Sequence, residues 1–249
     1  MLRKVRAREG TPDRESFMQK GITMAELIGC RNLSKHYAAD GKAVAAVERV
    51  NLSVGRGDFV VILGHSGSGK TTLLSLIGGL TVPDDGEVVI DGVENWHQGD
   101  NALSAMRNRK IGFIFQFASL IPSLTVLENV LLPLAFGERV KAGREQAMEM
   151  LTLVGLAGKA NAFPAQLSGG QQRRVAIARA FVNNPEVILA DEPTGDLDEE
   201  TEQDILALFR KYNAQGTTFL VVTHNNGLAV TQANPRVFTM RQGVLEEAA

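Results

Sequence analysis

The stretch GHSGSGKT, Gly64 to Thr71, lies between the apolar, β-branched run FVVIL (59–63) and the helical segment TTLLSLIGGL (71–80). It matches the pattern G-x-x-x-x-G-K-[ST] in the strand–loop–helix context that a phosphate-binding loop requires. The glycines let backbone N–H groups turn toward phosphate oxygens, the lysine charge reaches the β and γ phosphates, and the threonine hydroxyl can ligate Mg²⁺. We therefore predict a nucleotide site containing Gly64, His65, Ser66, Gly67, Ser68, Gly69, Lys70, Thr71 and Thr72, with His65 as a solvent-facing spacer.

A second apolar strand, VILADE (187–192), ends in two carboxylates. The C-terminal edge of a parallel sheet is where α/β folds place ligands. Asp191 is therefore a candidate Mg²⁺ ligand, acting through water, and Glu192 is a candidate general base for an attacking water. Alone, such a strand end is as often a solvated terminus. The phosphate loop in the same chain favours the metal and base roles.

Composition limits the class of protein. The chain has 249 residues, 44% hydrophobic and 22% charged, with a formal net charge of −2. It lacks the basic excess of nucleic-acid-binding proteins, so we expect no nucleic-acid partner. It has no run of about 18 apolar residues, so we expect no membrane crossing by the chain itself. The single cysteine, Cys30, cannot form a disulfide within one chain, and we assign it no role beyond a small buried residue.

The order of patterned segments predicts an α/β fold. Strand patterns dominate 26–116, helical spacing dominates 121–163, and strands alternate with helices after 167. We read residues 26–54 as short strands with turns. The alternation predicts a parallel sheet with crossover connections beside the phosphate loop, and the helical spacing after residue 121 predicts a small helical lobe.

The first 23 residues differ in composition from the rest of the chain. They carry six basic residues but no apolar core, so they do not form a secretory signal. Patterned sequence begins at Met24. We expect 1–23 to be a disordered extension, or to precede the true start at Met24, with a basic contact to a membrane surface as the alternative. Residues 24–249 are then the folded domain.

The stretch LSGGQQRRVAIARAF (167–181) begins like a second phosphate loop but has no lysine. Together with GHSGSGKT, Gln116 after IGFIF, LADEPTGDLD (189–198) and His224 after the strand TTFLVVT, it resembles the ATP-binding-cassette (ABC) ATPases over 26–247. The resemblance implies an α/β fold in which a phosphate-loop nucleotide-binding core with a mixed sheet carries an antiparallel β subdomain and a small inserted helical subdomain at approximately 121–180. It also implies ATP and Mg²⁺ as cofactors, ATP hydrolysis, and a homodimer on ATP binding. In that dimer the signature segment of one chain, Ser168, Gly169, Gly170 and Gln171, caps the γ-phosphate held by the partner's loop.

The same resemblance assigns further roles. It implies that Tyr37 stacks on adenine, although a core or surface tyrosine is the open alternative. Gln116 would reach the metal and the water, His224 would contact the γ-phosphate, and Asp198 would contact the partner chain. The implied catalytic set is Glu192, His224, Gln116 and Lys70, and the implied metal set is Thr71, Gln116 and Asp191. Asn226 replaces an acid often found two positions after the histidine, which leaves the anchoring of that loop open.

A finer resemblance concerns the branch of the family. FQFASLIPSLTVLENVLLPL (115–134) and ADEPTGDLD (190–198) resemble bacterial lipoprotein-releasing, macrolide-exporting and cell-division cassettes. This implies a peripheral ATPase subunit at the cytoplasmic face of the inner membrane, bound to a separate integral membrane permease and powering export or lipoprotein release. Two alternatives stay open: a switch that controls cell-wall hydrolysis through a membrane partner, and a soluble cassette acting on DNA or ribosomes. The substrate does not follow from this sequence.

Overall fold

The computed structural model describes residues 26–39, 42–96, 98–136, 143–195, 197–225, 227–228 and 234–248. The extension predicted over 1–23 and the loop residue Asn226 lie outside these ranges. Among the described residues, no helix combines the length and apolar character that a membrane crossing needs.

A mixed sheet forms the centre of the described part of the chain. Its strand order is β10-β9-β3-β8-β7-β6, with neighbours parallel except for the antiparallel β9–β10 hairpin. In β3, Phe59 and Val61 face one core, whereas Val60 and Ile62 face the other, because successive side chains of a strand point to opposite faces. The strands are β3 (Phe59–Leu63), β6 (Ile111–Ile114), β7 (Val187–Asp191), β8 (Thr218–Thr223), β9 (Arg236–Arg241) and β10 (Val244–Glu247).

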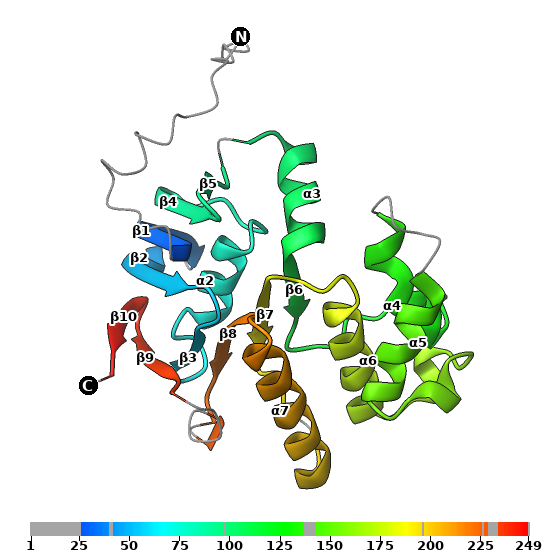
Figure 1. Cartoon of the computed structure of the whole chain (residues 1–249). Helices are drawn as coiled ribbons and strands as arrows, with labels where there is room; N and C mark the ends of the chain where they lie inside the picture. The colour runs from blue at the N-terminus through cyan, green and yellow to red at the C-terminus, as the bar shows by residue number, and fades with distance from the viewer. Residues whose placement is uncertain are drawn as a thin grey trace.

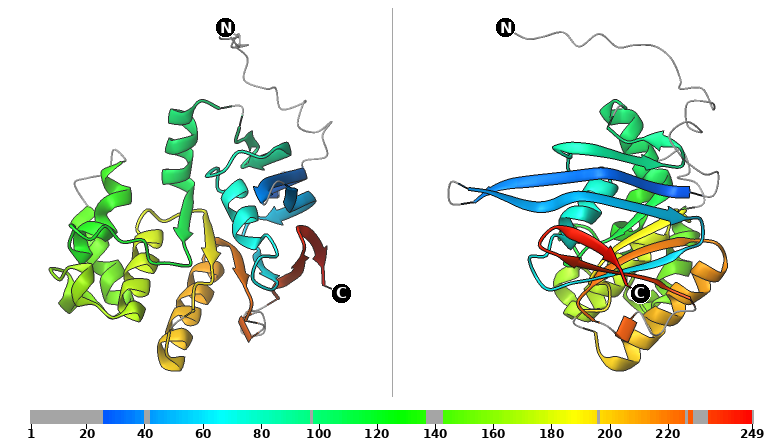
Figure 2. Two further views of the ribbon diagram at one scale, coloured as in Figure 1. Left: turned by 180° about the vertical axis from the view of Figure 1, so that it is seen from behind. Right: turned by 90° about the vertical axis from the view of Figure 1, so that its left-hand side faces the viewer.

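A separate antiparallel sheet packs against one helix-covered face of the mixed sheet. Its strand order is β2-β1-β4-β5, formed by β1 (Glu26–Ala39), β2 (Lys42–Gly55), β4 (Asp85–Ile90) and β5 (Val93–Glu94). The prediction of short strands over 26–54 is wrong, since β1 and β2 are 14 residues each and form one long hairpin (Figure 2). Register shifts interrupt their pairing, and such irregularities break the alternation that the sequence pattern relies on.

Helices cover both faces of the mixed sheet. Helix α2 (Lys70–Ile77) and helix α3 (Asp100–Lys110) pack in the core shared with the antiparallel sheet. Helix α7 (Glu199–Ala214) packs on the opposite face. This arrangement places the N-terminus of α2, which follows the phosphate loop, at the carboxyl end of the parallel strands (Figure 1).

A helical subdomain lies between β6 and β7 in the sequence. It consists of α4 (Val126–Ala135), α5 (Gly143–Leu153), the short 3₁₀ helices η2 (Ala157–Lys159) and η3 (Pro164–Gln166), and α6 (Gly169–Phe181). These helices lie beside β6, at the opposite end of the molecule from β10 (Figure 1). The predicted fold class, an α/β nucleotide-binding core with an antiparallel β subdomain and an inserted helical subdomain, is confirmed.

Candidate functional site

The phosphate loop connects β3 to α2 and packs against neighbouring strands. Gly67 and Gly69 adopt φ angles of +77° and +106°, a left-handed conformation that favours glycine. A β-carbon on Gly69 would lie 1.9 Å from the carbonyl oxygen of Ala46 in β2, and one on Gly64 would lie 2.5 Å from that of Met240 in β9. Gly64 and Gly69 are therefore required because backbone from other strands occupies the space beside them.

The turn between β9 and β10 also supports the loop. The N–H of Gly243 donates to the carbonyl oxygen of Ser68 (3.0 Å), and the N–H of Glu48 donates to the carbonyl oxygen of Gly243 (2.9 Å). The Ser68 hydroxyl is buried and has no hydrogen-bond partner in the described part of the chain. A buried hydroxyl is normally paired, so this group is available to a bound ligand.

Lys70 is the first residue of α2, and its side chain lies back across the loop. Its Nζ donates to the carbonyl oxygens of Gly64 (2.6 Å) and His65 (3.1 Å). The side chain is buried, so its positive charge is concentrated inside the loop beside the N-terminal N–H groups of α2. Loop N–H groups, helix terminus and ammonium together form a site that favours a phosphate anion.

The first metal candidates meet at the end of β7. The hydroxyl of Thr71 donates to Oδ2 of Asp191 at 2.6 Å. Burial raises the pKa of Asp191, as does the adjacent charge of Glu192; the Thr71 hydrogen bond and the charges of Lys70 and Arg173 oppose this rise. Mg²⁺ takes hydroxyl, carboxylate and phosphate oxygens and is commonly held by one or two carboxylates. The oxygens at this strand end therefore fit Mg²⁺.

The carboxylate of Glu192 is held by the turn after β8. Its Oε2 accepts from the Thr223 hydroxyl at 2.8 Å, and its Oε1 accepts from the backbone N–H of His224 at 3.0 Å. The His224 Nδ1 lies 2.7 Å from the same Oε1. Glu192 has a positive φ of 48°, which is uncommon for a residue with a side chain. The base candidate is thus fixed by contacts from a separate strand.

These elements enclose a cleft of about 580 Å³, a volume typical of small-molecule sites. The structure brings together in its lining most of the residues that the sequence predicts. They are His65, Ser66, Gly67, Ser68, Gly69, Lys70, Thr71, Thr72, Gln116, Asp191, Glu192 and His224.

The signature segment lies apart from this cleft, at the N-terminus of α6. The Ser168 hydroxyl accepts from the N–H of Gln171 (3.2 Å), and the Gln171 Oε1 accepts from the N–H of Ser168 (3.1 Å). This reciprocal pair is a capping box. Asp198 likewise caps α7 by accepting from the N–H of Thr201 at 2.9 Å. Within one chain these residues have structural roles, and none of them lines the cleft among the described residues.

Tyr37 lies on β1, near the cleft but outside its lining. It pairs with Val44 of β2, two residues before Ala46, which is a separation of roughly 7 Å along a strand. Tyr37 is 46% exposed, and the Lys35 Nζ lies 5.7 Å from its ring centroid. This distance is within the range of a cation–π contact.

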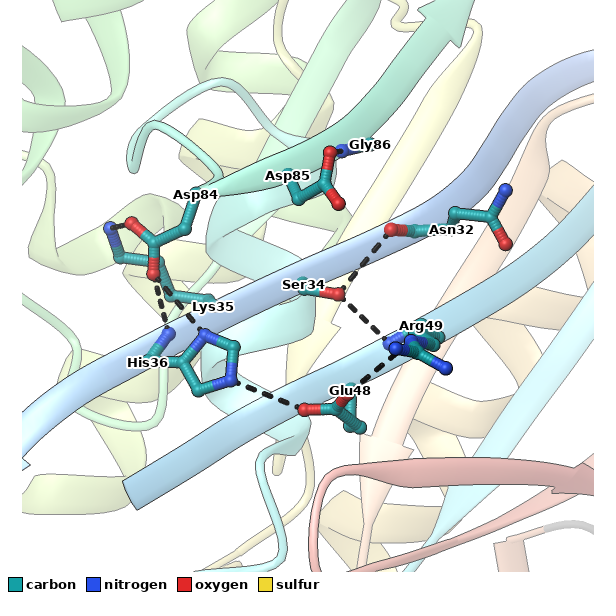
Figure 3. Close-up of polar contacts among 9 residues, drawn as sticks. All are labelled: Asn32, Ser34, Lys35, His36, Glu48, Arg49, Asp84, Asp85 and Gly86. Atoms are coloured by element: carbon teal, nitrogen blue, oxygen red, sulfur yellow. Dashed lines mark hydrogen bonds and ion pairs between the residues drawn. The ribbon is translucent and has the colours of Figure 1, made fainter. Parts of the chain in front are cut away.

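Asp84 fixes the strand around Tyr37. Its Oδ1 accepts from the Lys35 Nζ at 2.8 Å, and its Oδ2 accepts from the backbone N–H of His36 at 2.7 Å (Figure 3). These hydrogen bonds lower the pKa of the Asp84 carboxyl. The neighbouring Asp85 instead accepts from the N–H of Gly86 at 2.9 Å, so Asp84 and not Asp85 connects to the tyrosine.

A family model described as ABC transporter matches residues 47–195, which is more than half of the chain. The chain belongs to the ABC transporter family. It is an ATP-binding ATPase subunit of that family, with ATP and Mg²⁺ as its cofactors.

Individual relatives of this ABC ATPase agree with the family model. An uncharacterized ABC transporter ATP-binding protein of Thermotoga maritima is 49% identical over 224 residues, covering 90% of this chain and 95% of the relative. Two solved structures of MJ0796, described as a bacterial ABC transporter cassette, match with TM-scores of 0.83. One is a dimer in a post-hydrolysis state bound to ADP and Pi, with 43% identity over 89% of this chain and 98% of MJ0796. The other is also dimeric, with 44% identity over the same shares.

Sequence reasoning missed three residues that line the cleft of this ABC ATPase: Ala46, Arg173 and Gly195. Ala46 and Gly195 line it through their place in the tertiary fold, which residue type does not reveal. For Arg173 a signal existed, since it follows Gly169 by four positions on α6. That spacing places both residues on one face of the helix.

Proposed function

We propose that this ABC ATPase powers export or lipoprotein release through a separate integral membrane permease, at the cytoplasmic face of the inner membrane. We further propose that residues 24–249 are one ATPase domain and that residues of approximately 121–180 are its inserted lobe. The observation that carries the permease proposal is an apolar groove beside the loop that follows β6. This loop contains Gln116 and is called the Gln116 loop.

This groove has a volume of about 720 Å³ and lies between α3 and the helical subdomain. Phe136, which lines it, is 80% exposed. Large exposed apolar side chains that cluster at a concave surface are typical of a protein contact. The groove also includes Phe115, the residue before Gln116, so a partner bound there lies next to the nucleotide cleft. Its apolar lining includes Leu80, Phe113, Phe115, Ile121, Leu132, Pro133 and Phe136.

Nucleotide binding follows from the geometry of the phosphate loop. Loop N–H groups and the N-terminus of α2 receive the phosphates. The Lys70 ammonium, which now contacts two loop carbonyl oxygens, exchanges these for β- and γ-phosphate oxygens. Thr71 and, through water, Asp191 would hold Mg²⁺, with Gln116 as a further oxygen ligand, and the ion would neutralise charge on the phosphates. Tyr37 stacks on adenine through its exposed ring surface.

Hydrolysis is assigned to the cluster at the ends of β7 and β8. Glu192 accepts a proton from the attacking water, and Thr223 and His224 keep its carboxylate oriented. His224 is exposed on the cleft side, where it contacts the γ-phosphate. Gln116, from the loop after β6, positions the water and connects the cleft to the groove.

The signature segment is assigned to the site of a second copy. A β-carbon on Gly169 would meet open space, so the fold of one chain does not require glycine there. Close approach by a phosphate of the partner's nucleotide does require it, and the N-terminus of α6 favours that anion. Asp198 contacts the partner chain. The dimeric structures of MJ0796 support this arrangement.

Affinity capture tests the permease proposal. Tagged Glu192→Gln protein with ATP, purified from detergent-solubilised native cells, should retain an integral membrane protein with a large periplasmic domain. Phe136→Ser should reduce its recovery, whereas Phe163→Ser, at a phenylalanine that is 45% exposed outside the groove, should not. Recovery of only DNA-associated or ribosomal proteins would overturn the transporter function. A membrane-bound regulator of cell-wall hydrolysis as the partner would favour the switch.

A further inference from the structure

A buried arginine connects α6 to the ends of two central strands. We call α6 the signature helix because it begins in the signature segment. Arg173 on α6 is 6% exposed. Its Nη1 lies 3.1 Å from the carbonyl oxygen of Phe115, just after β6, and 3.1 Å from that of Glu192, just after β7. One guanidinium group therefore contacts both the start of the Gln116 loop and the backbone of the base candidate.

The contact to Glu192 falls on a backbone in a rare conformation. Its φ of 48° is retained only where the surroundings fix it. The Glu192 N–H donates to the carbonyl oxygen of Val222 (2.9 Å), and its own carbonyl oxygen accepts from the N–H of Gly195 (3.2 Å) as well as from Arg173. Arg173 is the contact in this set that comes from the helical subdomain.

Charge and burial make this contact strong. A hydrogen bond from a charged donor is stronger than one from a neutral donor. Burial of a cation is tolerated only where polar groups of the protein replace the water that it loses. Arg173 also lies close enough to Asp191 to act on that carboxyl electrostatically. A shift of α6 therefore changes the position of the backbone that carries the base.

We propose that Arg173 is a positioning residue that transmits the position of the signature helix to Glu192. It follows Gly169 by one helical turn, so a second copy that engages Ser168 and Gly169 fixes the segment from which Arg173 projects. The base is then aligned when the dimer is closed. This inference rests on the proposed roles of Glu192 and of the signature segment.

Arg173→Met in the full-length chain removes the N–H donors and keeps an apolar side chain of similar length. We expect kcat for ATP to fall about tenfold or more, with KM within about threefold, because the substrate contacts remain. The matched control is Arg174→Met. Arg174 is the next residue of α6, and its Nη1 donates to the carbonyl oxygen of Val154 at 3.1 Å, away from the cleft. The kcat of Arg174→Met should stay within about threefold of the parental value. Equal losses of kcat in Arg173→Met and Arg174→Met would overturn the proposal.

A double-mutant cycle separates positioning from a direct contact with phosphate. In the Glu192→Gln background, Arg173→Met should reduce the remaining hydrolysis by less than about threefold, because its effect passes through the missing base. A further tenfold fall would show that Arg173 acts independently of Glu192, and would overturn the proposal.

Conservative replacement keeps the test valid if Arg173→Met does not fold. Arg173→Lys retains a cation with N–H donors and should fold, with parental KM and at least about a tenth of the parental kcat. A folded lysine variant with no measurable hydrolysis would count against the proposal. If Glu192→Gln itself hydrolyses ATP at the parental rate, the proposed base fails. If Glu192→Gln loses about a hundredfold or more of its hydrolysis and Arg173→Met retains the parental kcat, only the role of Arg173 fails.

Discussion

Glu192 and His224 are joined twice, since the Oε1 of Glu192 lies 3.0 Å from the backbone nitrogen of His224 and 2.7 Å from its Nδ1. The backbone bond does not depend on the identity of residue 224, whereas the ring contact does. The two contacts can therefore be separated by mutation.

His224→Ala removes only the ring. The backbone N–H still orients Glu192, so the fold and the affinity for ATP should remain close to those of the parent. We expect kcat to fall about a hundredfold, within the range seen when groups that assist proton transfer are lost. Steady-state ATPase kinetics measure this change. A rise in KM with kcat unchanged would instead assign the ring to binding.

Glu192→Gln keeps the shape of the side chain and removes the base. ATP and Mg²⁺ contacts from Lys70, Thr71 and Asp191 are unaffected, so the variant should bind ATP and accumulate as a closed dimer. Hydrolysis should fall by about a hundredfold or more. Size-exclusion chromatography with and without ATP reports the dimer, and a monomer at saturating ATP would contradict the shared site.

Gly169→Ala tests the signature segment without disturbing the fold. The added methyl group meets open space in one chain, and alanine is a better helix former than glycine by up to about 1 kcal/mol. Thermal stability should be equal or higher, while kcat should fall about tenfold because the methyl group obstructs the partner's nucleotide. Gly158→Ala, which also faces open space, is the control and should leave kcat unchanged. Parental activity in both variants would remove the case for a site shared between chains.

Asp84→Ala releases Lys35 and the His36 N–H, and so loosens the strand that carries Tyr37. The stacking and cation–π contacts concerned are worth about 0.5–1.5 kcal/mol, so KM for ATP should rise about two- to tenfold with little change in kcat. Asp85→Ala, which leaves those contacts in place, should have the parental KM. If Tyr37→Ala raises KM and Asp84→Ala does not, Tyr37 stacks on adenine without needing the contacts of Asp84.

Cys30 should be chemically inert in the folded protein. Burial, reinforced by the charge of Glu26, raises the pKa of its thiol to about 12. A raised pKa means that the neutral thiol stabilises the folded state below the unfolded pKa of about 8.5. This contribution is lost as the pH rises toward the folded value. A disulfide exchange reagent at pH 8 should react only at the rate of unfolding, and rapidly in denaturant. Fast labelling of the native protein would contradict the burial.

Local patterns were sufficient for most of the central core. The run 59–63 and the run 187–191 are both strands as predicted. The first is apolar throughout and is followed by Gly64, and the second is apolar up to its last residue, Asp191. Helix α3 was not predicted, since only Leu103 and Met106 are buried in it and two large apolar residues give little periodicity. The contact of Arg173 with Glu192 joins residues 19 positions apart, and no local pattern encodes such a pairing.

The close packing of Gly69 against Ala46, and of Ser68 against Gly243, lowers the entropic cost of binding ATP. A loop that must order itself around a ligand gives up conformational entropy at the moment of binding, and the affinity is reduced accordingly. Here strand β2 and the β9–β10 turn already fix the donors in place. ATP therefore meets a rigid receptor, and the free energy of its phosphate contacts remains available for bringing two copies of the chain together.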